Sequence, residues 1–160
     1  AVWMPYQWMF FKSALDAGLA DFAYRIADTA LTLWQNECAE SYCCFEHFMI
    51  ESRRGAGWHQ FSGLSFPIVQ WFSAYYRPGT LTTGFDAFVR HTDWAPDNSA
   101  LNATLDFTAA GRSTVLAVLQ PGPKAVTASV PCTVTTRHDG LLELTFALDA
   151  PCTVTINIHP

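Results

Sequence analysis

The chain has 160 residues, of which 50% are hydrophobic and 14% are charged, and its formal net charge is −5. This charge argues against a nucleic-acid-binding protein, because phosphate binding requires clustered Lys and Arg. Charged residues break up the apolar stretches before they reach the roughly 20 residues that a transmembrane helix requires, so we expect no membrane span. The chain begins without Met on a segment typical of the middle of a domain, which indicates a fragment or a processed piece. The partner of a fragment would be the rest of its parent polypeptide.

The composition changes near Asp97, which predicts two regions, residues 1–96 and residues 97–160. In the first region, one helix should end at Gly18 and a second should begin with Asp21 as its cap. A third helix is expected over residues 65–76, capped by Ser65 and with Pro67 in its first turn. The apolar residues at helical spacing in the first two helices are Phe10, Phe11, Ala14, Leu15, Leu19, Phe22, Ile26, Ala30, Leu33 and Trp34.

The second region is typical of strands separated by turns. Its segments are "STVLAVL" (113–119), "AVTASVPCTVTT" (125–136), "LLELTFAL" (141–148) and "CTVTINI" (152–158). The sequence "PCTVT" occurs at 131–135 and again at 151–155, which indicates two similar strand starts. Five cysteines favour free thiols over a Cys132–Cys152 disulfide. Asn102-Ala103-Thr104 fits the glycosylation pattern and slightly favours a secreted or periplasmic location.

A long loop over residues 40–63 joins the second and third helices and carries the candidate chemistry. Its central stretch, "CCFEHFMIESRRGAGWHQFSGLS" (43–65), combines carboxylates, glycines and aromatic residues in a chain with few charges. Loops of this length in compact domains are usually functional or disordered, and aromatic residues argue against disorder. Aromatic faces stack on sugar rings, and carboxylates supply the acid and base that break a glycosidic bond. The loop therefore suggests a site for an oligosaccharide or glycoside.

Three parts of this loop resemble a known family: Phe45-Glu46-His47-Phe48, Gly55-Ala56-Gly57 and Phe61-Ser62-Gly63-Leu64-Ser65. They are similar to the late catalytic segment of the (α/α)6-barrel glycosidases, which include trehalases, family 63 processing glucosidases and mannosylglycerate-hydrolase-like enzymes. The opening segment, residues 3–8, is similar to the start of the preceding inner helix in that group. The resemblance covers residues 1–76 and implies the last helical hairpins of an (α/α)6 toroid, followed by a small antiparallel β-sandwich-like region.

The resemblance also implies an inverting glycoside hydrolase without a cofactor. In that group the glutamate of the first motif is the general base, which is Glu46 here, and the general acid lies upstream, outside this chain. The implied substrate-binding residues are Trp3, Gln7, Trp8, Trp58, His59, Gln60 and Phe61. The residues 49–52 depart from the family pattern, so the sugar and the linkage are left open. A fragment without its general acid is expected to be inactive by itself.

Other interpretations of the same residues stay open. Glu51 lies nearer the Gly-rich turn and is the alternative catalytic carboxylate, whereas Glu46 could instead be a structural carboxylate paired with Arg53 or Arg54. The residues Cys43, Cys44 and His47 do not form a zinc pattern, so no metal is expected. The alternative function is a non-catalytic carbohydrate-binding or interaction module.

Overall fold

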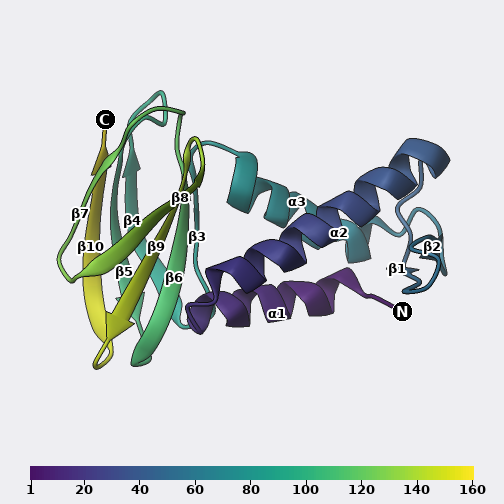
Figure 1. Cartoon of the computed structure of the whole chain (residues 1–160), viewed down its shortest axis with the longest axis horizontal. Coiled ribbons are helices and arrows are strands. Elements are labelled where there is room, and N and C mark those ends of the chain that lie inside the picture. Colours follow the sequence, from purple (N-terminus) through teal and green to yellow (C-terminus); the bar gives the residue numbers. More distant parts are fainter. The chain divides into compact units, whose positions relative to one another are not determined.

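The structure is a computed structural model that describes residues 1–160, apart from the side chain of Ser62. Within the described chain it has three helices and ten strands in three antiparallel sheets (Figure 1). The helices are α1 (Met4–Asp16), α2 (Ala20–Ser41) and α3 (Ser62–Tyr76). The strands are β1 (His47–Phe48), β2 (Gly55–Ala56), β3 (Thr80–Thr82), β4 (Ala87–Trp94), β5 (Leu101–Phe107), β6 (Gly111–Val118), β7 (Ala125–Ala128), β8 (Cys132–His138), β9 (Leu141–Leu148) and β10 (Cys152–His159).

The expected (α/α)6 toroid is wrong. The described chain contains only three helices, and most of it is a β-rich domain whose strands begin at Thr80, upstream of the composition change near residue 97. The six-hairpin barrel was implied by the resemblance of residues 1–76 to the (α/α)6-barrel glycosidases, and the structure does not support it. In the structure α1 and α2 form a single hairpin, and α3 leads directly into strands.

The chain divides into two compact units, which we describe separately. The helical unit comprises residues 1–11 and 21–72, and the strand unit comprises residues 12–20 and 73–160. None of the described helices combines the length and apolarity needed to cross a membrane.

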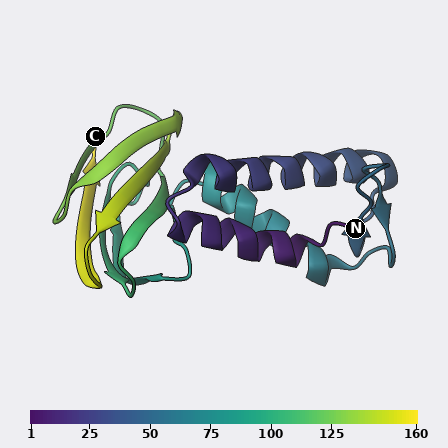
Figure 2. The same cartoon turned by 60° about the horizontal axis from the view of Figure 1, so that its bottom comes forward.

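Aromatic packing forms the centre of the helical unit. Trp8 stacks on Phe11 with ring centroids 5.0 Å apart, and the Trp71 ring meets the Trp8 ring edge-on at 5.8 Å. The small residues Ala23, Ala27 and Ala30 give α2 its buried stripe. Figure 2 shows α1 and α2 running in opposite directions, as the short turn between them predicts.

The turn after α1 confirms the predicted helix end. Gly18 has a φ of 68°, the left-handed conformation that glycine adopts readily. The amide of Gly18 bonds to the carbonyl of Leu15 at 3.0 Å, and the amide of Leu19 bonds to the carbonyl of Ala14 at 2.8 Å. This pair of hydrogen bonds is a Schellman motif, which satisfies the last carbonyls of a helix. Asp21 lies in the first turn of α2 rather than before it, so it faces the positive end of the helix dipole without being the cap.

The third helix starts earlier than expected. It begins at Ser62, so Ser65 is not its cap, and Pro67 lies inside the helix rather than in the first turn. The Ser65 hydroxyl is buried without a hydrogen-bond partner in the described chain. The side chains of Ile68, Trp71, Ala74 and Tyr75 are buried, whereas Phe66, Val69 and Phe72 are exposed.

The strand unit contains two four-stranded antiparallel sheets, with strand orders β4-β5-β10-β7 and β3-β6-β9-β8. Leu, Val, Ile and Phe side chains of both sheets form one hydrophobic core, in which the Phe107 and Phe146 ring centroids are 5.4 Å apart. The two "PCTVT" segments begin β8 and β10, which confirms the expectation of two strand starts. All five cysteines are free thiols.

Helix ends of the same unit are fixed to its strands by polar contacts. The carboxylate of Asp16 accepts hydrogen bonds from the amides of Phe85 at 2.7 Å and Asp86 at 3.0 Å. The ring nitrogen Nε2 of His138 lies 2.8 Å from the carbonyl oxygen of Tyr75, and its ring stacks on Tyr76 with centroids 5.4 Å apart. These contacts hold the end of α1 and the end of α3 within the strand unit.

Candidate functional site

The segment between α2 and α3 has a small ladder of its own. Strands β1 and β2 pair in antiparallel register, with His47 opposite Ala56 and Phe48 opposite Gly55. A backbone hydrogen bond of 2.6 Å from the amide of Phe61 to the carbonyl of Cys44 closes the segment at its base. The segment over residues 43–61, which we call the site loop, is therefore fixed by its own backbone.

Glu46 lies at the centre of the site loop, half-buried. Its amide donates to the carbonyl of Trp58 at 3.0 Å, and its Oε2 accepts the amide of Trp58 at 3.1 Å. Its second carboxylate oxygen, Oε1, forms no hydrogen bond with the described residues. The carboxylate is thus fixed through one oxygen, and the other has no hydrogen-bond partner among the described residues.

Gly57 makes this close approach possible. It has a φ of 79°, and a Cβ atom built there would lie 2.5 Å from Glu46 Oε2 and 2.9 Å from the His47 ring. A side chain at this position would displace the carboxylate or the ring. The glycine of the predicted Gly-rich turn therefore has a specific role, which is to leave room for Glu46.

Exposed aromatic rings accompany the carboxylate. The Trp58 side chain is 69% exposed, and its ring centroid lies 6.2 Å from that of Phe61, which is 38% exposed. His59 and Gln60, which stand between them, are also exposed. Gln60 has a φ of 60°, an uncommon conformation for a residue other than glycine. The structure therefore brings Glu46, Trp58 and Phe61 together on one loop.

The three predicted substrate-binding residues near the start of the chain lie in different environments. Trp3 stacks on His47 with ring centroids 5.1 Å apart, and Val2 forms a two-way backbone bridge with Phe48, so the start of the chain adjoins the site loop. Trp8 belongs to the aromatic core with Phe11. Gln7 lines a separate hollow of about 410 Å³ with residues of α1 and α2. Of these three residues, Trp3 contacts the site loop, whereas Trp8 packs in the core and Gln7 lines a separate hollow.

The alternative carboxylate, Glu51, lies in the turn between β1 and β2. The amide of Met49 bonds to the carbonyl of Arg54, and the amide of Arg53 bonds to the carbonyl of Met49, both at 2.9 Å. Glu51 is exposed at this turn, with no hydrogen bond or ion pair among the described residues. In contrast to Glu46, it has no hydrogen bond that fixes its carboxylate.

Arg54, one of the two arginines that could pair with Glu46, pairs with a different carboxylate. Arg54 binds Glu37 of α2, with Nε to Oε2 at 2.8 Å and Nη2 to Oε1 at 3.2 Å. The Gly55 amide also donates to Glu37 at 2.8 Å. These contacts, the Arg54 hydrogen bond above all, lower the pKa of Glu37 to about 2 against the opposing effect of burial.

The sequence analysis did not single out Glu37, although its spacing in α2 indicates that it is buried. It continues the buried stripe of α2 formed by Ala23, Ala27 and Ala30, two turns further along the same face. A carboxylate at such a position must be paired, because an unpaired buried charge is costly. Glu37 therefore ties the site loop to α2 and is not the open carboxylate of the site.

The site contains no evident metal centre. Within the described part of the chain, no group of three or more His, Cys, Asp or Glu side chains is arranged to hold a metal ion. Cys38 lies near Cys43, with its Sγ 3.2 Å from the carbonyl oxygen of Cys43, and burial raises the pKa of the Cys38 thiol to about 11. A thiol with a raised pKa is a poor nucleophile and a poor metal ligand.

No protein-family model matches the chain, and no curated protein matches it.

Proposed function

We propose that this chain supplies the general base of an inverting glycoside hydrolase that cleaves O-glycosidic bonds in oligosaccharides, and that the base is Glu46. The proposal depends on the position of the Glu46 carboxylate. One oxygen is fixed by the Trp58 amide, the other is open, and the Trp58 and Phe61 rings on the same loop are exposed. The resemblance of the three loop motifs to inverting glycosidases supports the same role.

The chemistry follows from this arrangement. Glu46 removes a proton from a water molecule, whose oxygen attacks the anomeric carbon on the face opposite the leaving oxygen, so the configuration inverts. The fixed orientation through the Trp58 amide keeps the open oxygen directed at that water. A general acid about 6.5–9.5 Å from the base protonates the leaving oxygen. We place that acid outside these 160 residues.

The exposed rings suit the apolar face of a sugar. Trp58 and Phe61 are tilted by 39° to each other, so together they present a shallow aromatic surface next to the carboxylate. Burying an exposed tryptophan on a ligand contributes substantially to binding, because its area is large and its ring is rigid. Trp58 is therefore assigned to binding and Glu46 to proton transfer.

The test uses the full-length protein that carries this chain, with a panel of α- and β-linked oligosaccharides. Glu46→Gln should lower kcat by about 10²–10⁴-fold, the usual contribution of general base catalysis, with little change in thermal unfolding. Glu51→Gln is the matched control, because Glu51 is exposed at the turn of the same loop, and it should retain wild-type turnover. NMR of the released sugar should show the inverted anomer. Wild-type turnover in Glu46→Gln, or retention of configuration, would overturn the proposal.

The exposure of Trp58 also favours a second candidate, a non-catalytic carbohydrate-binding module. A ring that is 69% exposed can bind a glycan without any cleavage. In that case Trp58→Ala would abolish glycan binding, Glu46→Gln would leave it unchanged, and the wild-type protein would release no sugar from any member of the panel.

A further inference from the structure

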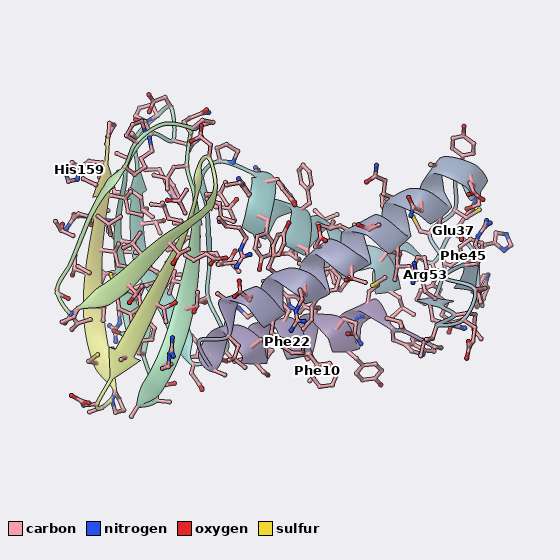
Figure 3. All side chains as sticks on the ribbon, viewed as in Figure 1. Phe10, Phe22, Glu37, Phe45, Arg53 and His159 are labelled. Atoms are coloured by element: carbon pink, nitrogen blue, oxygen red, sulfur yellow. The ribbon has the colours of Figure 1, made fainter. Side chains whose placement is uncertain are left out.

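The strand unit has a hollow, lined by both polar and apolar residues, at one end of the sheet β4-β5-β10-β7. Its volume is about 480 Å³, and it lies where β4 ends, β5 begins and β10 ends. The residues around it that carry polar or aromatic side chains are Asp93, Trp94, Asn102, Asn157 and His159. Figure 3 labels His159, whose side chain points outward from the end of β10.

The strand register places the polar side chains in one row. Asp93 of β4 lies opposite Asn102 of β5, which in turn lies opposite Asn157 of β10. Neighbouring strands are about 4.8 Å apart, so the three side chains are spaced evenly across the sheet. His159 follows Asn157 by two residues and therefore lies on the same face. The opposite face of these strands is the hydrophobic core.

Hydrogen bonds within the row set the orientation of the two amides. Asn102 Nδ2 donates to Asn157 Oδ1, which leaves the Oδ1 of Asn102 and the Nδ2 of Asn157 for a ligand. Asp93 and His159 make no hydrogen bond or ion pair with the described residues. The row thus offers a carboxylate, an amide acceptor, an amide donor and an imidazole.

The wall of the hollow is preformed. Trp94 packs against the hydrophobic core, and the turn that follows it is closed by a 3.0 Å hydrogen bond from the amide of Ala95 to the carbonyl of Ala100. The carbonyl of Asn98, inside this turn, accepts the amide of Gln120 at 3.0 Å. A ligand would find these groups already ordered, which lowers the entropic cost of binding.

The lining selects a class of ligand. Lys and Arg are absent from the lining, so a phosphate or another anion has no positive partner there, and one carboxylate beside one imidazole is too few ligands for a metal ion. Amides, a carboxylate and an imidazole all pair with hydroxyl groups, and the remaining lining residues of the hollow are apolar. We propose that this end of the sheet is a saccharide-binding site that holds a neutral, polyhydroxylated chain end without cleaving it. The proposal does not depend on Glu46.

The test is a titration of the full chain, isotopically labelled and unglycosylated so that Asn102 keeps its free amide. The probes are maltohexaose, cellohexaose, xylohexaose and mannohexaose, each followed by amide chemical shifts. At least one should shift the amides of residues 93–102 and 157–159 in a saturable way. Asn102→Ala should raise the Kd at least tenfold, and Thr104→Ala, on the same face but outside the hollow, should leave it unchanged.

Two further variants keep the test decisive. If Asn102→Ala does not fold, Asp93→Asn and His159→Ala, which alter exposed side chains, should each raise the Kd severalfold. Trp58→Ala and Glu46→Gln should leave this binding intact, so its failure is distinguishable from failure of the proposed catalytic role. The proposal is overturned if none of the four probes shifts these amides, or if the variants of Asn102, Asp93 and His159 bind as the wild type does.

Discussion

Glu37 is a carboxylate fixed for folding rather than for chemistry. Its side chain is 2% exposed, and it accepts hydrogen bonds from Arg54 and from the amide of Gly55. Its pKa is lowered to about 2, so the ionised form is favoured in the folded chain. Glu46 is the opposite case, because it is held by a single backbone amide and keeps one oxygen open.

We predict that Glu37 makes stability depend on pH in the acid range. The folded pKa of about 2 lies below the ordinary value of 4.5, so the stabilisation is complete above pH 4.5 and is lost as the pH falls towards 2. Glu37→Gln should therefore lower the free energy of unfolding by about 1–3 kcal/mol at pH 6, because it replaces a charged hydrogen bond with a neutral one. Urea unfolding at pH 6 and pH 3 measures both effects, and the gap between the two proteins should narrow at pH 3.

The control is Glu40→Gln. Glu40 also pairs with Arg54, at 2.7 Å, but its side chain is 65% exposed, so water screens the interaction. This variant should unfold as the wild type does at both pH values. An equal loss in the two variants, or a constant gap for Glu37→Gln between pH 6 and pH 3, would contradict the role of the buried pair.

At the level of single residues, the sequence singled out Glu46 as a candidate and did not single out Glu37. The motif around Glu46 and the nearby Trp58 are contiguous enough to be recognised, and the backbone of one loop brings them together. Arg54 and Glu37 are 17 residues apart, and their pairing depends on how the loop folds back on α2. No local pattern carries that information, so the sequence left a pairing of Glu46 with Arg53 or Arg54 open, whereas the structure pairs Arg54 with Glu37.

At the scale of the element, the conformation of the site loop requires a glycine at position 57. Gly57 has a positive φ of 79°, and any Cβ there would lie 2.5 Å from Glu46 Oε2. We predict that Gly57→Ala lowers the free energy of unfolding by about 1 kcal/mol or more, since both the backbone and the carboxylate must move. On the proposed role of Glu46, sugar release by the full-length protein should fall as well. Thermal unfolding and turnover together check this prediction.

Gly63 provides the matched substitution in α3. It lies in the first turn of the helix, its φ is not positive, and the nearest atom to a Cβ there is 3.8 Å away. Gly63→Ala should therefore be neutral or stabilise the chain by up to about 1 kcal/mol, because alanine favours a helix. Equal losses in Gly57→Ala and Gly63→Ala would show that the close approach to Glu46 is not the cause.

Elements were predicted well where a single residue type controls the backbone. Gly18 ends α1 as expected, because the left-handed conformation and the Schellman bonds are properties of that position alone. The start of α3 was placed three residues late because Ser65-Phe66-Pro67 is typical of a helix N-terminus. The helix instead begins at Ser62, directly after the hydrogen bond of Phe61 that closes the site loop, so tertiary structure overrides the local signal.

At the scale of the whole chain, the resemblance of the loop motifs implied the wrong architecture. The three motifs that carry the resemblance lie within residues 45–65, so they do not determine how many helices the chain forms. The described chain has only three helices, and apolar side chains of α1 and α3 remain exposed. The strand regions were recognisable because their polar and apolar residues alternate and their turns are marked by Gly and Pro.

These exposed residues lead to a prediction about the chain in solution. Tyr6, Met9 and Phe10 follow one another at helical spacing on α1, and Val69 and Phe72 do so on α3. Exposed apolar clusters of this kind are characteristic of surfaces that associate with other surfaces.

We therefore predict that the 160-residue chain self-associates with rising concentration. The double variant Phe10→Glu, Val69→Lys should shift the chain towards monomer without lowering its melting temperature. Light scattering coupled to gel filtration measures the mass, and Thr32→Lys, at an exposed polar position of α2, is the control that should not change it. A wild-type chain that stays monomeric across the concentration range, or a double variant that associates equally, would show that these side chains do not drive association.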